Sequence, residues 1–250
     1  MIRTEGIEKR YGDFQALQPL DLTVEAGEVF GFLGPNGAGK TTTIRILSGV
    51  LPPTRGRLFI DGVDMAQDPV AAKQRIGFIP DRPYLYEKLT GREMLAFVGG
   101  LYGMDPGVIE AHSMELLAFH GLSDFADRLI EGYSHGMKQR LTLSAALLHT
   151  PRLLIVDEPM VGLDPRGARQ IKDVFRQVAA EGRTVFLSTH SLDVAQEVCD
   201  RFAIINRGRI VAHGTYDEIR SEGRDDAKDL EEIFLRILEE ERNNMPVGGS

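Results

Sequence analysis

Apolar and polar residues alternate along much of the first thirty positions, most clearly in LDLTVEAGEVFGF at residues 20–32. Because successive side chains of a β-strand point to opposite faces, this period of two predicts short strands separated by turns over residues 1–30. A helix is expected next, from Thr41 to about Gly49, and the stretch LPPTRGRLFIDG then turns and forms another strand. The chain is therefore expected to begin with an antiparallel β subdomain.

A short helix and a buried strand are predicted in DPVAAKQRIGFIP, residues 68–80. Asp68 is a suitable N-cap, Pro69 suits the first helical position, and IGFI is apolar throughout. From about Pro83 to Thr150 the apolar spacing becomes helical, as in GREMLAFVGGLYG, with few strand signals. We expect this segment to be a helical subdomain inserted between two strands of the core.

Two short apolar runs, LLIV at 153–156 and TVFLS at 184–188, are typical of parallel strands that are covered on both faces. A helix of about fifteen residues, from Arg166 to Glu181, joins them, and strand, helix, strand is the crossover unit of an α/β sheet. RFAIINRGRIVAHGT predicts a hairpin with its turn at NRG. The last 35 residues are acidic and predict a helix at DLEEIFLRILEE followed by a frayed tail. The sequence contains no internal repeat.

Composition narrows the functional classes. The 250 residues are 42% hydrophobic and 26% charged, as in an ordinary soluble globular protein, and we expect one large domain with subdomains. The net charge of −8 and the pI near 5.3 argue against a protein that wraps nucleic acid, because such a protein needs clustered positive charge.

Cysteine usage and the lack of long apolar runs indicate the compartment. Cys199 has no second cysteine to pair with, so we expect a reducing cytosol and interpret Cys199 as a small buried hydrophobe. The start of the chain has no apolar signal-peptide region, and no run approaches the ~20 apolar residues of a membrane span. Any membrane role is therefore expected to come through a partner.

A glycine-rich loop between an apolar strand and a helix is the strongest chemical signal. GPNGAGKT at residues 34–41 satisfies the pattern G-x-x-x-x-G-K-[ST] after the apolar run VFGFL. In such a loop the backbone N–H groups turn inward on phosphates, Lys40 reaches the β- and γ-phosphates, and Thr41 offers its hydroxyl to Mg²⁺. The predicted nucleotide-binding residues of this segment are Gly34, Pro35, Asn36, Gly37, Ala38, Gly39, Lys40, Thr41 and Thr42. The alternative is a glycine-rich turn without a ligand.

Two carboxylates and a histidine follow the two buried strands. LLIVDEP places Asp157 and Glu158 at a strand end, where alternation puts them on different faces and gives them different roles. Asp157 is predicted to hold the Mg²⁺ shell and Glu158 to point at a water that attacks the γ-phosphate. His190 closes the next strand at the same carboxyl edge, where open α/β sheets bind ligands, and its imidazole can donate to a γ-phosphate oxygen. A solvated strand end is the alternative for the carboxylates.

The other histidines have no such placement. His112, His120, His149 and His213 are interpreted as ordinary surface or core residues.

The stretch EGYSHGMKQRLTLSAAL, residues 131–147, predicts a second anion site. Ser134 is a suitable N-cap, and the free backbone N–H groups of a helix N-terminus attract anions, here with Lys138 and Arg140 nearby. This site follows the glycine-rich loop by about a hundred residues, which raises the question of why one protein has both.

Five motifs, in their order and spacing, resemble those of the ATP-binding cassette of transporters. They are the glycine-rich loop at 34–41, YSHGMKQR at 133–140, LLIVDEP at 153–159, GLD at 162–164 and STH at 188–190. The resemblance covers residues 1–215 and leaves 216–250 as an acidic helical extension and tail. It implies an α/β fold: a P-loop NTPase core with a mostly parallel sheet, the N-terminal antiparallel β subdomain and a helical subdomain inserted at about 83–150.

The same resemblance implies a head-to-tail dimer. In it, the signature turn of one subunit (residues 133–140) covers ATP held by the glycine-rich loop of the other. The two predicted anion sites would then be two halves of one site, divided between two protomers.

Further roles follow from matching positions. The resemblance implies that Tyr11 in EKRYGD stacks on adenine and that Asp164 belongs to the loop that communicates between the two sites. Ser134 and Gly136 match the signature serine and second glycine. His135 replaces the usual first glycine, so its backbone φ must be negative. An exposed strand aromatic is the alternative for Tyr11.

Asp81 in FIPDRP stands where the family usually has the glutamine that touches Mg²⁺ and senses the membrane subunit. An acidic residue there, together with the YSxGMKQR form of the signature, resembles the ATP-binding subunits of bacterial exporters whose membrane subunit is a separate chain. We expect Asp81 to be a metal ligand beside Thr41 and Asp157. The alternative is that Asp81 turns away and pairs with a basic neighbour such as Arg82.

The hypothesis is thus an ATP-hydrolysing subunit that uses ATP and Mg²⁺ and powers transport, with export favoured, through membrane subunits encoded separately. It works as a dimer of cassette domains, in the cytoplasm at the inner face of the cell membrane, and needs no nucleic acid. ATP closes the dimer, Glu158 orients or deprotonates water, and hydrolysis reopens it. Residues 83–150 are the expected surface for the membrane partner, the alternative being simple packing onto the core.

Two rival functions fit the sequence less well. A soluble cassette ATPase acting on nucleic acid or iron–sulphur assembly would be supported by long coiled-coil insertions, a second cassette or a basic face, and the sequence contains none of these. A small-molecule P-loop kinase disagrees with the signature turn and the GLD motif.

Overall fold

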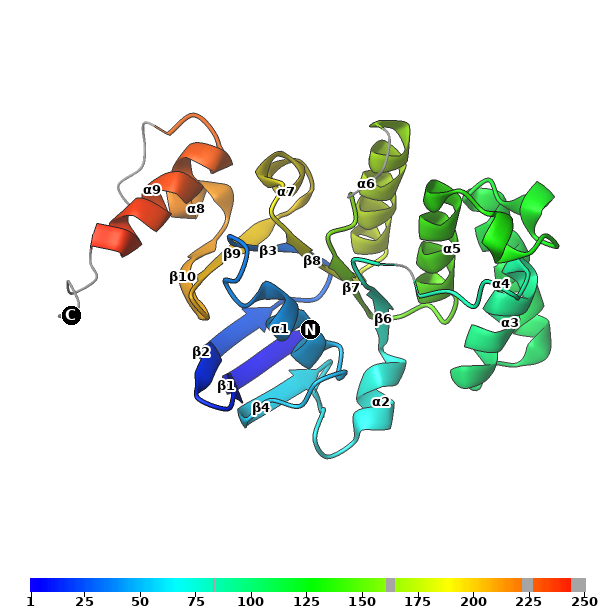
Figure 1. Ribbon diagram of the computed structural model, residues 1–250, viewed down its shortest axis with the longest axis horizontal. Coiled ribbons are helices and arrows are strands. Elements are labelled where there is room, and N and C mark those ends of the chain that lie inside the picture. Colours follow the sequence, from blue (N-terminus) through cyan, green and yellow to red (C-terminus); the bar gives the residue numbers. More distant parts are fainter. Residues whose placement is uncertain (83, 161–164, 222–226, 244–250) are drawn as a thin grey trace.

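The computed structural model describes residues 1–82, 84–160, 165–221 and 227–243. The elements in chain order are β1 (Ile2–Tyr11), β2 (Phe14–Val24), β3 (Val29–Leu33), α1 (Lys40–Leu47), β4 (Arg55–Ile60), β5 (Val63–Asp64), α2 (Pro69–Gln74), β6 (Ile76–Ile79), α3 (Gly91–Leu101), α4 (Pro106–Phe119), the 3₁₀ turns η1 (Ser123–Phe125) and η2 (Ile130–Gly132), α5 (His135–Leu147), β7 (Leu153–Asp157), α6 (Pro165–Ala180), β8 (Thr184–Thr189), α7 (Leu192–Val198), β9 (Arg201–Asn206), β10 (Arg209–Gly214), α8 (Tyr216–Ser221) and α9 (Leu230–Asn243). Figure 1 shows how they are arranged in space.

The larger sheet has the strand order β10-β9-β3-β8-β7-β6. Neighbouring strands from β9 to β6 are parallel, and β10 pairs antiparallel with β9. Every residue of β3, β7 and β8 is buried, which is the burial expected for apolar parallel strands covered on both faces. The predicted mostly parallel sheet is confirmed.

Alternation along these strands divides the core into two layers. Phe30 and Phe186 stack with ring centroids 5.8 Å apart in the cluster that also holds α1 and the N-terminal strands. Val29 and Leu187 belong instead to the cluster that holds α6 on the opposite face. Helix α1 therefore lies between the two sheets. The segment between β3 and α1, residues 34–39, consequently lies at the edge of the larger sheet.

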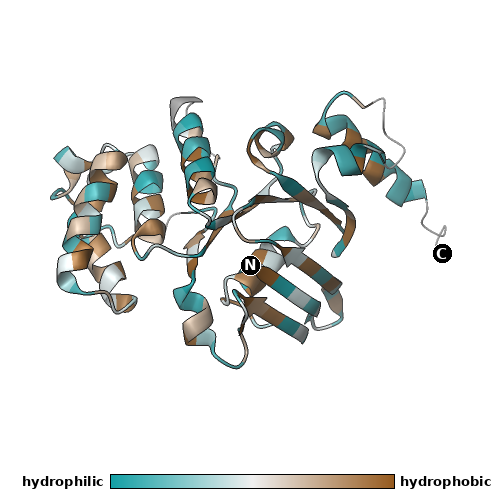
Figure 2. Ribbon diagram, turned by 180° about the vertical axis from the view of Figure 1, so that it is seen from behind, coloured by the Kyte–Doolittle hydropathy of each residue, from teal (hydrophilic) through white to brown (hydrophobic). Residues whose placement is uncertain are grey.

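The smaller sheet has the order β2-β1-β4-β5, and all its pairs are antiparallel. Hydrophobic and hydrophilic residues alternate along β1 and β2, as Figure 2 shows, because one face covers the core and the other faces solvent. The predicted N-terminal antiparallel subdomain is confirmed.

Helices α3, α4 and α5 form the helical subdomain between β6 and β7, two strands that are neighbours in the sheet. Its first helix begins at a capping box: the Thr90 side chain accepts from the Glu93 N–H, and the Glu93 side chain accepts from the Thr90 N–H. The subdomain has a hydrophobic cluster of its own, with Leu95, Leu117 and Leu141 at its centre. The predicted insertion is confirmed.

The remaining predictions differ from the structure by small amounts. The helix expected from Thr41 to about Gly49 begins at Lys40 and ends at Leu47, and the hairpin predicted at residues 201–215 is β9–β10. Helices α8 and α9 pack beside β10 (Figure 1), while the predicted tail and the GLD motif lie outside the described residues. None of the helices within the described ranges is both long and apolar enough to span a membrane.

The histidines outside the predicted motifs are core or surface residues, as interpreted: His120 is buried and His213 is exposed. The pKa of His120 and of His149 falls to about 4, in each case because burial disfavours the imidazolium, as expected of core histidines. Cys199 is only partly buried as a residue, in contrast to the prediction, and packs against the two core clusters beside β3; burial of its sulphur raises the pKa of the thiol.

Candidate functional site

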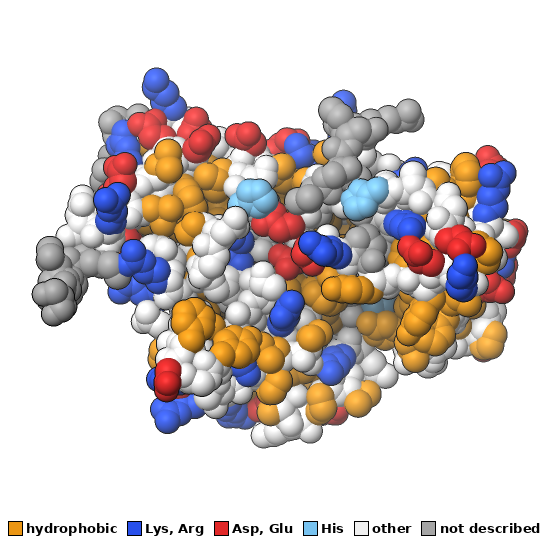
Figure 3. Space-filling model, viewed as in Figure 1, with side chains coloured by type: hydrophobic (Ala, Val, Ile, Leu, Met, Phe, Trp, Pro, Cys, Tyr) orange, Lys and Arg blue, Asp and Glu red, His pale blue; other side chains and the backbone are white. Residues whose placement is uncertain are grey.

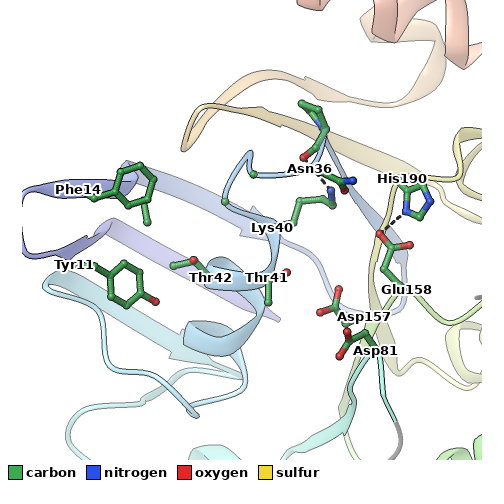
Figure 4. A pocket seen from close by; sticks show the side chains of 14 residues that line it. Tyr11, Phe14, Asn36, Lys40, Thr41, Thr42, Asp81, Asp157, Glu158 and His190 are labelled. Atoms are coloured by element: carbon green, nitrogen blue, oxygen red, sulfur yellow. Dashed lines mark hydrogen bonds and ion pairs between the residues drawn. The ribbon is translucent and has the colours of Figure 1, made fainter.

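A pocket of about 410 Å³ opens at the carboxyl edge of the parallel sheet. Its lining residues are Tyr11, Phe14, Ala16, Pro35, Asn36, Gly37, Gly39, Lys40, Thr41, Thr42, Asp81, Asp157, Glu158 and His190. Figure 3 shows acidic and histidine side chains close together near the middle of the same face. In Figure 4 the two aromatic residues lie at one end of the pocket and the carboxylates and His190 at the other.

The glycine-rich loop turns from β3 into α1 through two left-handed residues. Gly37 has φ 78° and Gly39, the N-cap of α1, has φ 109°, a range that favours glycine. No side chain caps the helix, so the N–H groups at its N-terminus have no intrahelical or side-chain partner there. The backbone geometry can therefore accept an anion.

Lys40 lies inside this loop. Its side chain is buried, and Nζ donates to the carbonyls of Gly34 at 2.6 Å and Pro35 at 3.2 Å. Burial lowers the pKa of Lys40, and the charges of Glu158 and Asp157 oppose that shift. An ammonium held by weak carbonyl partners can exchange them for the stronger charged acceptors of a phosphate.

The two adjacent carboxylates both line the pocket at the edge of the sheet. Alternation ends with β7 at Asp157, and Glu158 has φ 49°, which re-aims its side chain. Asp157 is only 6% exposed, and its pKa is raised mainly by burial and further by the negative charge of Asp81. Asp81 faces the pocket beside Asp157, as Figure 4 shows.

Glu158 is held by two hydrogen bonds from β8 and the residue after it. Thr189 Oγ1 donates to Oε2 at 3.2 Å, and His190 Nδ1 lies 2.8 Å from Oε1. An ionised carboxylate only accepts, so Nδ1 carries the proton, and a neutral His190 then has a bare Nε2. His190 can donate from Nε2 to a phosphate only as an imidazolium or after the ring leaves Glu158.

The aromatic end of the pocket comes from the hairpin of β1 and β2. Tyr11 and Phe14 are opposite each other across its turn and are 46% and 66% exposed. Sequence reasoning selected Tyr11 and missed Phe14. The sequence feature that could have identified Phe14 is the two-residue turn Gly12–Asp13, because such a turn pairs positions 11 and 14 across the hairpin.

The signature turn lies apart from the pocket. Ser134 caps α5 by accepting from the Met137 N–H at 3.3 Å, as predicted, and His135 begins the helix without a positive φ. A Cβ added at Gly136 would meet nothing within 4 Å, so the chain itself does not require glycine there. Neither Ser134 nor Gly136 lines the pocket, and Asp164 falls outside the described residues.

The oxygen donors fit a magnesium ion that is shared with a ligand. Thr41, Asp81 and Asp157 offer hard oxygen atoms in one pocket, the donor type that Mg²⁺ prefers. Within the described part of the chain, no group of three or more His, Cys, Asp or Glu side chains could hold a metal ion. Mg²⁺ usually takes one or two carboxylates and completes its shell with phosphate oxygens and water.

Comparisons with known proteins agree with this arrangement. The family model described as "ABC transporter" matches residues 17–161. The chain is 42% identical over 229 residues to the daunorubicin resistance ATP-binding protein DrrA3 of Streptomyces coeruleorubidus, covering 92% of this chain and 72% of that protein.

Solved structures give the same result. The ATP-binding subunit of an ABC transporter superposes with a TM-score of 0.89 at 33% identity, covering 95% of this chain and 99% of that one. A dimeric bacterial ABC transporter cassette superposes with a TM-score of 0.79 at 25% identity, covering 86% and 98%.

Proposed function

This chain belongs to the ABC transporter family, and from that premise we propose that it is the ATP-hydrolysing subunit of an exporter whose membrane subunits are separate chains. The observation that carries the proposal is one pocket that joins the glycine-rich loop to Asp157, Glu158 and His190. The relative named for daunorubicin resistance supports export as the direction of transport.

The shape of the pocket suits a nucleotide lying lengthwise. The nucleobase would rest on Tyr11 and Phe14, and the phosphates would reach Lys40 and the N-terminus of α1 (Figure 4). This pose leaves the γ-phosphate nearest to Glu158 and His190.

Each polar residue then has a distinct role in hydrolysis. Lys40 neutralises phosphate charge that grows in the transition state, and Glu158 orients the attacking water and accepts its proton. Mg²⁺, which Thr41, Asp157 and Asp81 would hold, would supply further charge neutralisation on the phosphate oxygens. The hydrogen bond from His190 fixes the Glu158 carboxylate before the nucleotide arrives.

The signature turn would complete the site of a second protomer. Ser134 and Gly136 lie at a helix N-terminus outside the pocket of their own chain, and Gly136 leaves open space where a phosphate could approach the backbone. The similarity to a dimeric cassette supports a dimer, and the position of the signature turn favours a head-to-tail arrangement.

The helical subdomain offers a surface for a membrane partner. Tyr84, Tyr86 and Leu101 are 79%, 60% and 71% exposed, and Tyr86 packs edge-on against Phe97. Large exposed apolar side chains gathered on one subdomain are typical of interaction sites. We propose that this partner holds the protein at the inner face of the cell membrane. The similarity to a daunorubicin resistance protein argues against a role in nucleic-acid processing or iron–sulphur assembly.

Lys40→Ala tests the nucleotide site directly. The affinity for ATP should fall about 10- to 100-fold, because a hydrogen bond from a charged group contributes about 1.5–3 kcal/mol. Equilibrium titration with a fluorescent ATP analogue measures it, and Lys73→Ala, which removes an exposed lysine of α2, is the matched control. Equal affinities in the two variants would remove the support for this site.

Asp81→Asn tests the acidic residue at the metal site. A carboxylate ~5 Å from a divalent ion gains about 3 kcal/mol per unit of ion charge at an effective dielectric of 20, and loses a comparable amount for each phosphate charge. The variant should therefore need more Mg²⁺ for half-maximal ATPase activity, while ATP affinity without metal stays level or improves. An unchanged Mg²⁺ requirement would leave the metal to Thr41 and Asp157.

A further inference from the structure

The turn between β9 and β10 lies directly against the glycine-rich loop. The Gly208 N–H donates to the Ala38 carbonyl at 2.8 Å, and the Gly208 carbonyl accepts from the Gln18 N–H at 2.8 Å. One residue of this turn thus joins the loop to strand β2 through two backbone hydrogen bonds. The Gln18 side chain adds a third link by donating to the Arg207 carbonyl at 3.3 Å.

This contact leaves no room for side chains. A Cβ added at Gly208 would lie 2.8 Å from the Ala16 carbonyl oxygen, and one added at Gly39 would lie 3.0 Å from the same atom. A Cβ at Gly34 would lie 2.4 Å from the carbonyl oxygen of Ile205, which precedes the turn. The hairpin therefore forms the outer wall of the glycine-rich loop and determines where its backbone can lie.

The same hairpin is attached to helix α9. Leu230, Ile233 and Ile237 of α9 are buried in one cluster with Leu33, the residue just before the loop, and with Ile204 of β9. At the other end of the helix, Glu241 forms an ion pair with Arg209, the residue that follows Gly208. Helix α9 thus contacts the hairpin at two places. Its apolar side chains pack against strand β9, and Glu241 pairs with the residue beside the turn.

We infer that helix α9 sets the affinity of the site for nucleotide by holding the β9–β10 turn against the glycine-rich loop. Arg209, Glu241 and Gly208 are positioning residues in this account, since none of them lines the pocket. The inference rests on the proposed function, because it assumes that the loop binds the phosphates of ATP. It assigns a role to the extension beyond residue 215, which the site itself does not use.

Gly208→Ala is the first test, with Gly62→Ala as its matched control. The two turns have the same geometry: Arg207 and Gly208 have φ 49° and 78°, and Asp61 and Gly62 have φ 47° and 78°. A Cβ at Gly62 meets nothing within 4 Å, so that variant carries the backbone strain without the collision. ATP-analogue affinity should fall about tenfold or more in Gly208→Ala and stay within about twofold of wild type in Gly62→Ala.

The ion pair is tested in the full chain in case Gly208→Ala does not fold. Glu241→Ala and Arg209→Ala should each weaken nucleotide binding about two- to fivefold and raise KM similarly, with kcat nearly unchanged. The exchanged pair Arg209→Glu with Glu241→Arg should recover most of the affinity. Glu239→Ala, an exposed carboxylate of the same helix, should have no effect.

The results distinguish a failure of this inference from a failure of the proposed function. The inference would be overturned if all the Arg209 and Glu241 variants bound the ATP analogue with wild-type affinity. It would also be overturned if Glu241→Ala and Glu239→Ala lost affinity equally. Either result would leave the proposed function intact. A wild-type protein that binds no ATP analogue would instead overturn the proposed function.

Discussion

Glu158→Gln should lower ATP turnover by about 100- to 10,000-fold, the range expected when a general base is lost. The amide keeps the size of the side chain. Its oxygen can still accept from His190, and its NH2 group can donate to the Thr189 hydroxyl, so the pocket should keep its shape. ATP binding should be retained, because the substitution removes a negative charge near the phosphates.

The trapped nucleotide should also hold the dimer together. Size-exclusion chromatography with ATP and Mg²⁺ should show a dimer of Glu158→Gln that persists, whereas the wild-type dimer dissociates as hydrolysis proceeds. Glu115→Gln, which changes an exposed glutamate of α4, should behave as wild type in both measurements. Wild-type turnover in Glu158→Gln would show that another group activates the water.

Ser134→Arg should abolish activity by placing a bulky cation where the signature turn meets the phosphates of the other protomer. The substitution also removes the cap of α5, a loss of about 1 kcal/mol in stability. Ser134→Ala removes the cap without the bulk and should keep a large part of the activity, so it separates the two causes.

Mixing inactive proteins tests whether the site is shared. Each site of the dimer would combine the glycine-rich loop of one protomer with the signature turn of the other. In a mixed dimer of Ser134→Arg with Lys40→Ala, both substitutions therefore fall in the same site, and the other site is intact. About a quarter of wild-type activity should return, because half of randomly formed dimers are mixed and each has one intact site of two. No recovery, under conditions where crosslinking demonstrates mixed dimers, would contradict the head-to-tail arrangement.

Local patterns predicted the parts of the fold that depend on local physics. The apolar strands β3, β7 and β8 follow from runs of consecutive apolar residues, and the cap at Ser134 follows from one polar side chain before a helix. These features need no knowledge of distant residues. The glycine-rich loop and the residues at the ends of β7 and β8, which the sequence also identified, supply most of the pocket lining.

Features that depend on distant residues or unusual dihedrals were missed. Glu158 has a φ of 49°, a backbone conformation that residue type does not reveal. The hydrogen bond between Glu158 and His190 joins neighbouring strands through side-chain rotamers that the pattern does not specify. Phe14 entered the site through pairing across a turn rather than through any motif.

The placement of the helical subdomain between adjacent strands also has a consequence for folding kinetics. Pairing β6 with β7 brings Ile76 next to Leu153 and so closes a long loop, whose entropy loss grows with loop length. Helices α3 to α5 have their own hydrophobic cluster and mostly local contacts, so they can collapse first and shorten that loop. The transition state for folding should therefore contain a formed helical subdomain while the β6–β7 ladder is still open, and unfolding should begin at that ladder.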